Sequence, residues 1–307
     1  MLLLGLAWLA GCGGEPPPRP PPLCFLERGN AYGGVAPVTP QEWLRALVRP
    51  KVVRGELIAE YDCTGAAIRW EPPPDTCIVK SPPLDPPAPQ ALGEQAVYER
   101  MLPDDRRLVW IVTHRFANGE GFGPVALVHI LKNGLETEAI GDLRLRTERV
   151  DLQLWTIGQS KVLQAAGEMC TNKDDPASCH RAINVLVLSD KAFVHPAITY
   201  RDGRCIDAPW VEVKRKEDLP LQTGWNRHFE ITSTVSHDTR YLVITEQVRV
   251  EESDPNAPDI PPREVRRIDT DRFIHVEGPR LLTRQHPLWP RILPSAGSLE
   301  LTQGAKP

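Results

Sequence analysis

The stretch that decides the fold is residues 229–250, FEITSTVSHDTRYLVITEQVRV. Residues 229–235 and 240–250 are runs of β-branched and apolar residues of strand length. Between them stand Ser236, His237 and Asp238, in a segment of residue types that favour turns. The stretch therefore predicts two antiparallel strands joined by a short turn.

Similar runs follow one another through most of the chain. They cover residues 108–114, 125–131, 152–157, 161–165, 183–188, 192–194, 263–268 and 272–276. Turn-forming residues separate them, for example Ser189-Asp190-Lys191 and Asp269-Thr270-Asp271. We therefore expect a mainly β domain over residues 90–295, built as an antiparallel meander or sandwich.

Two stretches of this domain share a layout. Residues 152–196 and 229–278 each run hairpin, long polar loop, hairpin, which is typical of propeller blades. Two or three such units are too few to close a propeller, which needs at least four. Propeller-like repeats therefore stay an alternative to the meander or sandwich.

Residues 24–89 form an N-terminal segment of helix and strand. Thr39, Pro40 and Glu42 predict the start of a helix, because Thr and Glu at this spacing form a capping box and Pro suits the first helical position. Its apolar face is Trp43, Leu44, Leu47 and Val48. A second short helix is expected over residues 90–101, after a Pro-rich tract at 82–89, and residues 296–307 form a C-terminal tail.

Composition excludes some classes of protein. Of 307 residues, 41% are apolar, which excludes wholesale disorder. The net charge is 36 − 40 = −4, with both signs spread along the chain, so we expect no nucleic-acid partner.

The first residues predict a targeting signal. Residues 2–11 are uncharged and too few to span a bilayer, which needs about 20, so they read as the core of a secretory signal. Leu9-Ala10-Gly11-Cys12 resembles the lipobox of bacterial lipoproteins. The resemblance implies that residues 1–11 are a removed signal peptide. It also implies that Cys12 becomes the acylated, palmitate-bearing N-terminus that attaches the protein to a membrane.

The segment that follows Cys12 suits a tether. Residues 12–23 include six prolines in seven positions and predict a stiff polyproline spacer of on the order of 34 Å. The residue after Cys12 is Gly13 and not Asp, which in Gram-negative lipoproteins implies export to the outer membrane. We therefore expect the protein in the cell envelope.

Six cysteines remain beside Cys12, an even number that suggests disulfides in an exported protein. Each close pair flanks a polar, Pro-containing stretch, as a clip across a loop would. The expected pairs are Cys63 with Cys77, Cys170 with Cys179, and Cys24 with Cys205. A metal site at Cys170, Cys179 and His180 fits no zinc spacing, so we expect no metal and no cofactor.

No catalytic motif is present, and no catalytic residue is assigned. Trp210, Trp225 and Trp289 stand in expected loops beside Pro, Gly or polar residues. If they converge, they could form a platform for a sugar or peptide.

The leading hypothesis is a lipid-anchored envelope protein that binds an envelope protein or glycan. The alternative is an envelope hydrolase whose site combines dispersed groups, such as His114 or His237 with a carboxylate. A cleft of titratable side chains would favour the hydrolase, and an exposed aromatic patch would favour the binding protein. A deep apolar cavity would favour a carrier of lipids.

Overall fold

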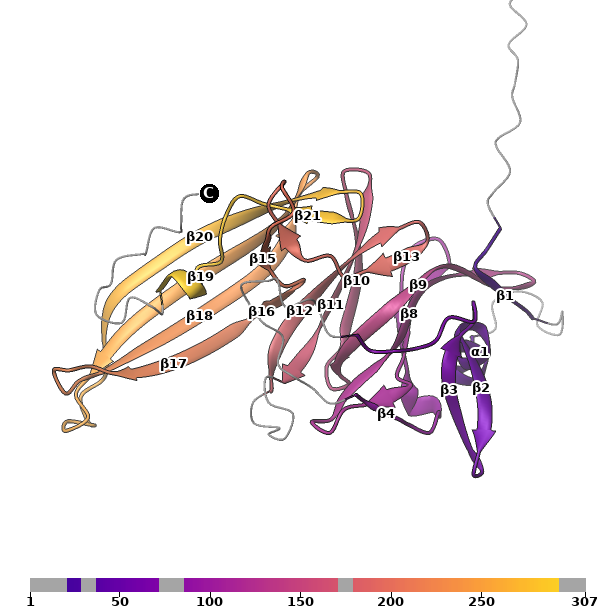
Figure 1. The fold of residues 1–307 in the computed structure, drawn as a ribbon, viewed down its shortest axis with the longest axis horizontal. Coiled ribbons are helices and arrows are strands. Elements are labelled where there is room, and N and C mark those ends of the chain that lie inside the picture. The colour runs from indigo at the N-terminus through magenta and orange to yellow at the C-terminus, as the bar shows by residue number, and fades with distance from the viewer. Residues whose placement is uncertain (1–20, 29–36, 72–85, 171–178, 293–307) are drawn as a thin grey trace, which may run out of the picture.

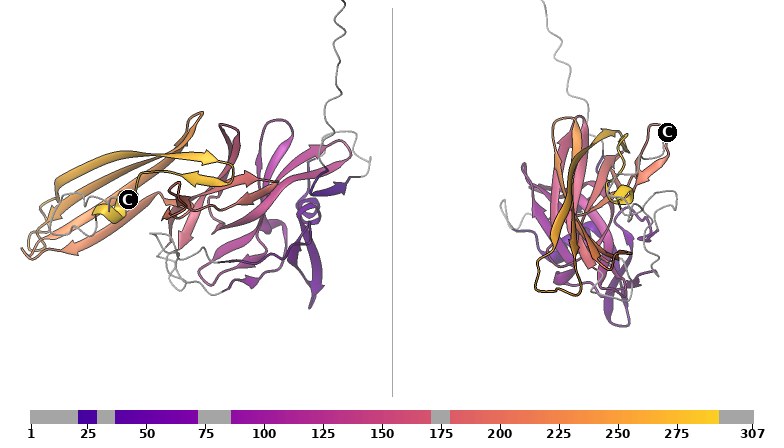
Figure 2. Two further views of the ribbon diagram at one scale, coloured as in Figure 1. Left: turned by 45° about the horizontal axis from the view of Figure 1, so that its top comes forward. Right: turned by 90° about the vertical axis from the view of Figure 1, so that its left-hand side faces the viewer.

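We describe the fold from a computed structural model, which covers residues 21–28, 37–71, 86–170 and 179–292. The molecule is mainly β, as predicted, and is elongated, with its N-terminal elements at one end and its C-terminal sheet at the other (Figure 1). The left view of Figure 2 also shows the C-terminal sheet continuing the long axis.

The first sheet has twelve strands and mixes antiparallel pairs with one parallel pair. Its main path is β10-β11-β12-β13-β9-β8-β6-β5, and β1, β4, β7 and β16 pair at its sides. In chain order these strands are β1 (Cys24–Glu27), β4 (Ala88–Pro89), β5 (Val97–Met101), β6 (Arg106–Ile111), β7 (His114–Arg115), β8 (Glu120–Leu131), β9 (Gly134–Arg146), β10 (Asp151–Ile157), β11 (Ser160–Cys170), β12 (Cys179–Ser189), β13 (Ala192–Val194) and β16 (Trp210–Glu212).

The first sheet folds over a core of its own. Side chains from β6, β8 and β9, among them Trp110, Leu127 and Leu143, pack against Leu163, Leu186 and others from β10–β13. Consistent with this, β10 lies against β5 and β6 at the other end of the path. The first sheet thus supplies two layers, and burial of its apolar side chains between them is the main favourable term.

The second sheet has seven strands in the order β15-β14-β21-β20-β19-β18-β17. They are β14 (Ile198–Thr199), β15 (Cys205–Asp207), β17 (Lys214–Pro220), β18 (Asn226–His237), β19 (Tyr241–Ser253), β20 (Arg263–Glu277) and β21 (Arg280–Leu282). The hairpin expected from residues 229–250 is confirmed, since β18 pairs with β19 from Asn226↔Ser253 to His237↔Leu242.

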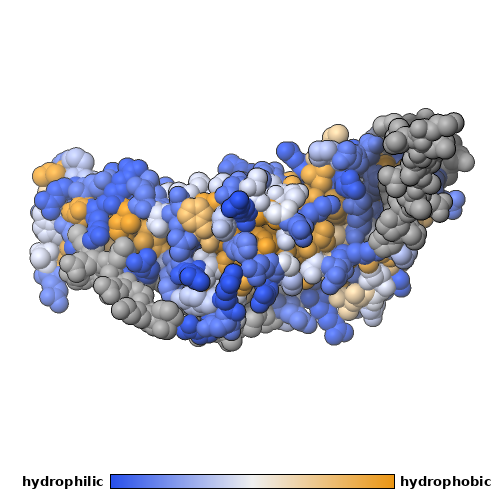
Figure 3. Space-filling model, turned by 90° about the horizontal axis from the view of Figure 1, so that it is seen from above, coloured by the Kyte–Doolittle hydropathy of each residue, from blue (hydrophilic) through white to orange (hydrophobic). Residues whose placement is uncertain are grey.

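The two sheets share one apolar cluster. Val162, Val185 and Val187 of β11 and β12 pack against Leu242, Ile244 and Ile274 of β19 and β20. Farther along the second sheet, α2 (Trp289–Ile292) packs on β18 and β19 through Leu288, Trp289 and Ile292. One face of the second sheet therefore packs on the first sheet and on α2, while the other carries mainly polar side chains beside the exposed Phe273. Seen from above, apolar residues form separate patches among hydrophilic ones (Figure 3).

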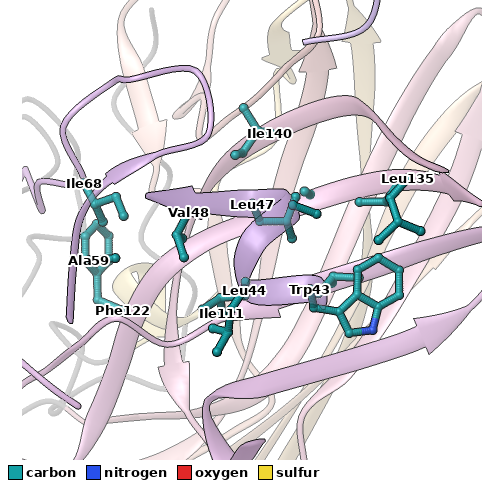
Figure 4. Close-up of a cluster of buried hydrophobic side chains, with 14 of the residues drawn as sticks. Trp43, Leu44, Leu47, Val48, Ala59, Ile68, Ile111, Phe122, Leu135 and Ile140 are labelled. Atoms are coloured by element: carbon teal, nitrogen blue, oxygen red, sulfur yellow. The ribbon is translucent and has the colours of Figure 1, made fainter. Parts of the chain in front are cut away.

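The N-terminal segment covers the outer face of the first sheet. The helix α1 (Pro40–Leu47) starts at Thr39, where both hydrogen bonds of the capping box are present. Trp43, Leu44 and Leu47 pack against Ile111 of β6 and Leu135 of β9 (Figure 4). A two-stranded sheet of β2 (Val48–Val53) and β3 (Glu56–Asp62) follows α1.

Two local predictions are wrong. Residues 90–101 do not form a helix: a 3₁₀ turn, η1 (Glu94–Ala96), leads into β5, which pairs with β6. Asp269-Thr270-Asp271 is not a turn either, because β20 runs through it. Asp269 and Asp271 lie on an exposed face of the sheet, where they accept hydrogen bonds from Gln247 and Thr245 of the neighbouring strand β19. These contacts suit a strand, although both residue types favour turns. Because β20 has no turn at this point, residues 229–278 do not share the layout of residues 152–196. The propeller-like repeats are therefore not confirmed.

The disulfides confirm one predicted pairing and correct two. Cys170 pairs with Cys179, as expected from their position at either end of a polar stretch. Cys24 pairs with Cys63, so the pairings Cys63–Cys77 and Cys24–Cys205 are wrong. The physical reason is the fold: β1 lies on the edge of β9, beside the turn after β3 that carries Cys63. Cys205 is also disulfide-bonded, and Cys77 lies outside the described residues.

Candidate functional site

A cavity of about 540 Å³ lies between the N-terminal segment and the first sheet. Its walls come from three parts of the chain: the segment after β3, the strands β8 and β9, and the region from β11 to β16. The lining residues are Ala67, Arg69, Trp70, Glu71, Phe122, Asp142, Arg144, Met169, Asn184, His195, Pro209 and Trp210. This volume lies within the range of roughly 300–1,000 Å³ that is typical of small-molecule sites.

The cavity opens where a short strand ends. β13 joins β12 to β9 through two parallel pairs, Ala192↔Ile140 and Phe193↔Gly141. Gly141 is needed there, because a Cβ atom on it would lie 2.2 Å from the carbonyl oxygen of Phe193. Beyond this point the chain leaves β9 at His195, and β12 pairs with β16 at Asn184↔Trp210. The two halves of the sheet thus separate next to Asp142.

Asp142 presents an unpartnered carboxyl group to this cavity. Among the described residues, no side chain or backbone group is hydrogen-bonded to its carboxyl oxygens. Burial is the main cause that raises the pKa of Asp142 from 3.8 to about 6, and the nearby carboxylates of Asp62 and Glu71 contribute less to this rise. The group therefore changes charge close to neutral pH.

His195 lies against the same strand. Its Nε2 is 2.6 Å from the backbone carbonyl oxygen of Asp142. A carbonyl only accepts, so Nε2 carries the proton and donates it, and Nδ1 keeps its lone pair. His195 is an exposed residue of the cavity lining, and desolvation by the surrounding protein lowers its pKa. The imidazole is therefore neutral at pH 7 and offers an acceptor.

Arg144 is a wall of the cavity whose charge is already neutralised. Its Nη2 and Nε atoms lie 2.6 and 2.9 Å from Oε2 of Glu120, which is fully buried. Glu120 also accepts from the amide of Asn118 and from the backbone N–H of Cys170. The Cys170–Cys179 disulfide thus stands beside this ion pair, and Arg144 keeps little charge for a ligand.

Two indoles line the cavity from distant parts of the chain. Trp70 packs edge-to-face on Phe116 at 5.3 Å between ring centroids, and the guanidinium of Arg144 lies over both rings. Trp210 enters from β16. These contacts fix Trp70 and leave the cavity with aromatic surface from two walls.

The three tryptophans expected to form a platform do not share one surface. Trp210 lines the cavity and also a smaller void of about 60 Å³, which Trp289 lines as well. Trp289, the first residue of α2, is buried against β18 and β19, whereas Trp225 is 37% exposed and follows β17 in a turn. The structure brings Trp210 and Trp289 together and leaves Trp225 apart.

The small void adjoins a buried charge cluster in the second sheet. Arg272 is 2% exposed, and its Nη1 and Nε lie 3.1 Å from the carboxylates of Asp207 and Glu246 respectively. The backbone N–H of Ala208 donates to Asp207, and that of Leu288 donates to Glu246. Burial raises the pKa of both acids, against the attraction of Arg272. We call these three residues the Arg272 cluster.

The histidines named for a hydrolase lie elsewhere. His114 is buried with its Nδ1 2.8 Å from the Thr113 hydroxyl, and burial lowers its pKa. His237 stacks on Trp155 at 4.6 Å between ring centroids. Neither lines the cavity. Sequence reasoning missed Trp70, Asp142 and His195, which do.

Across residues 21–28, 37–71, 86–170 and 179–292, no group of three or more His, Cys, Asp or Glu residues could hold a metal ion. In the same ranges, no helix has the length and apolar character needed to cross a membrane. Cys12 lies outside the described residues. The chain matches no protein-family model, no curated protein and no solved structure. Its function is therefore argued from the cavity itself.

Proposed function

We propose that this protein is a lipid-anchored binding protein of the bacterial cell envelope, which takes a glycan or a glycan-like part of an envelope polymer into the cavity. The observation that carries the proposal is the pairing of Trp70 and Trp210 with polar groups around one cavity. The C–H faces of a sugar ring pack on indoles, while its hydroxyls need hydrogen-bonding partners. Asp142, Asn184 and His195 supply such partners.

The same lining disfavours a carrier of lipids. Arg69, Glu71, Asp142 and Arg144 are charged residues on the cavity wall. A lipid tail buried against Asp142 would leave its carboxyl group without water or a partner, which is costly. A ligand with its own polar groups suits this surface better.

The anchor is proposed from Leu9-Ala10-Gly11-Cys12. The disulfide Cys24–Cys63 and the pairing of β1 with β9 attach the end of the spacer firmly to the body, as a tether requires. Disulfides are also typical of exported proteins. The outer membrane is the proposed membrane, because Gly13 and not Asp follows Cys12.

The anchor is tested by labelling cells with an alkyne analogue of palmitate. The full-length chain should carry the label, and the Cys12→Ser variant should lose it. A label that survives this substitution, or a mature protein that still begins at Met1, would refute the lipobox interpretation.

Binding is tested by calorimetry of the full mature chain with glucose, glucosamine, N-acetylglucosamine and their β-1,4-linked disaccharides. At least one of these should bind, and Trp210→Ala should weaken it about tenfold or more, as expected for losing a buried aromatic contact. Trp225→Ala is the matched control, because Trp225 lies outside the cavity. Binding of no probe, or an equal loss in both variants, would overturn the glycan-binding proposal.

A hydrolase remains a second candidate, because Asp142 and His195 line one cavity. A carboxyl group that titrates near pH 6 suits a general acid or base. Hydrolysis of the bound disaccharide, lost in Asp142→Asn with binding kept, would support the enzyme. Binding without turnover in the unmodified protein would exclude hydrolysis of that substrate.

A further inference from the structure

The charges around the cavity do not balance. Arg144 is neutralised by Glu120, and His195 is neutral at pH 7 because its surroundings are desolvated. Arg69 and Glu71 are both exposed at the margin of the cavity and carry opposite charges. Asp142 is then the carboxylate without a compensating cation among the described residues.

Further charges near Asp142 are also negative. Asp62, in the strand β3, and Glu71 both disfavour ionisation of Asp142, and no cation contributes appreciably to its pKa. Asp62 is occupied with the N–H groups of Thr64 and Ala66. The electrostatic potential at the Asp142 carboxyl is therefore negative, which favours a positively charged ligand group.

Three side chains of the cavity lining offer hydrogen-bond acceptors. Asp142 offers its carboxylate and His195 offers Nδ1. Asn184 donates its amide Nδ2 to the sulfur of Met169 at 3.6 Å, which leaves its carbonyl oxygen as an acceptor. Of the two arginines in the lining, Arg144 donates to Glu120 and Arg69 is exposed at the margin. The three acceptors are complementary to a ligand group with several N–H donors.

From this arrangement we infer that the ligand carries a protonated amine, which binds at Asp142 beside the faces of Trp70 and Trp210. An ammonium group has three N–H donors and no acceptor, and it is attracted both by a carboxylate and by the face of an indole. The inference rests on the proposed function and narrows it to amino sugars with a free amine or to other ammonium-bearing envelope components.

Such binding depends on pH in a defined direction. The amine binds the ionised form of Asp142, whose pKa is about 6 in the free protein. Lowering the pH from 7.5 to 5 protonates Asp142 and leaves the amine charged, so the affinity should fall about tenfold. Raising the pH back through 6 should restore it.

The experiment compares glucosamine with N-acetylglucosamine, which differ in the charge of one nitrogen. By calorimetry on the full mature chain at pH 7.5, glucosamine should bind about tenfold or more tightly than N-acetylglucosamine. This preference should disappear at pH 5 and in Asp142→Asn. Asp259→Asn is the matched control, since Asp259 is exposed and does not line the cavity.

The outcomes separate this inference from the proposed function. Equal affinity for the two sugars would overturn the amine inference and keep the glycan-binding proposal. Binding of cadaverine, a diamine without a sugar ring, with loss in Asp142→Asn and no binding of any sugar, would support the amine inference and overturn the glycan class. Binding of neither sugars nor cadaverine would overturn both.

Discussion

The Arg272 cluster and the cavity at Asp142 both remove carboxyl groups from water, and they differ in what surrounds the charge. Asp207 and Glu246 share the guanidinium of Arg272, and each accepts a backbone N–H. Asp142 has neither kind of partner among the described residues and faces a cavity about nine times larger, 540 against 60 Å³.

This difference separates the buried charges of the Arg272 cluster, which connect strands, from the carboxyl group that we propose binds a ligand. The Arg272 cluster joins β15, β19 and β20, so its ion pairs connect three strands of the second sheet. Asp142 destabilises the free protein when ionised, because burial disfavours its charged form. A ligand group that pairs with the Asp142 carboxylate in the cavity would offset this unfavourable free energy of burying the charge.

The largest expected effect is at the Arg272 cluster. Arg272→Met leaves two buried carboxyl groups without their cation and should lower the free energy of unfolding by about 3–5 kcal/mol. Urea denaturation at pH 7 measures this. Arg249→Met is the control and should cost less than about 1 kcal/mol, since the Arg249 side chain is 52% exposed and its ion pairs lie at the surface. A loss below about 1 kcal/mol in Arg272→Met would show that the cluster is not structural.

At Asp142 the expected effect has the opposite sign. Folding raises the pKa of Asp142 from 3.8 to about 6. The contribution of Asp142 to the free energy of unfolding is therefore fully present below pH 3.8, and it is lost as the pH rises through about 6. Asp142→Asn cannot ionise, so it avoids burying a carboxylate. It should stabilise the protein by about 2–3 kcal/mol at pH 8, but by only about 0.5 kcal/mol at pH 4. Denaturation at both pH values measures the difference. Asp259→Asn should change neither value, and a destabilising Asp142→Asn at pH 8 would contradict the assignment.

The smallest expected effect is on the polar face of the second sheet. Thr245 donates its hydroxyl to Asp271 at 2.6 Å on an exposed surface. Thr245→Val should cost about 0.5 kcal/mol or less, because water replaces the lost partner. A loss above about 2 kcal/mol in the same urea assay would mean that this face is not simply solvated.

The sequence predicted features that depend on residues close together in the chain, and it did not predict features that depend on distant residues. The capping box at Thr39 and the hairpin of β18 and β19 depend on residues close together in the chain, and both are observed. Cys170 and Cys179 are nine residues apart and pair across β11 and β12. Cys24 and Cys63 pair because β1 crosses to the edge of β9, a contact that no local pattern encodes.

The cavity residues were missed for a similar reason. Asp142 and Arg144 alternate with Leu143 and Leu145 along β9, which reads as an ordinary strand with one polar face. The tertiary structure makes β9 a central strand covered on both sides, and only then are these charged residues unusual. Trp70 was missed for the same reason, because its partners Phe116 and Arg144 are far from it in the sequence.

By itself, then, the sequence determined a mainly β chain, its local turns and caps, and the short disulfide loop, because these follow from the conformational preferences of neighbouring residues. Only the tertiary structure decided which strands became neighbours, and with them the cavity and the Arg272 cluster. Strand pairing in this chain joins segments as distant as β1 and β9, and burial, which shifts the pKa of Asp142, exists only once those segments have packed.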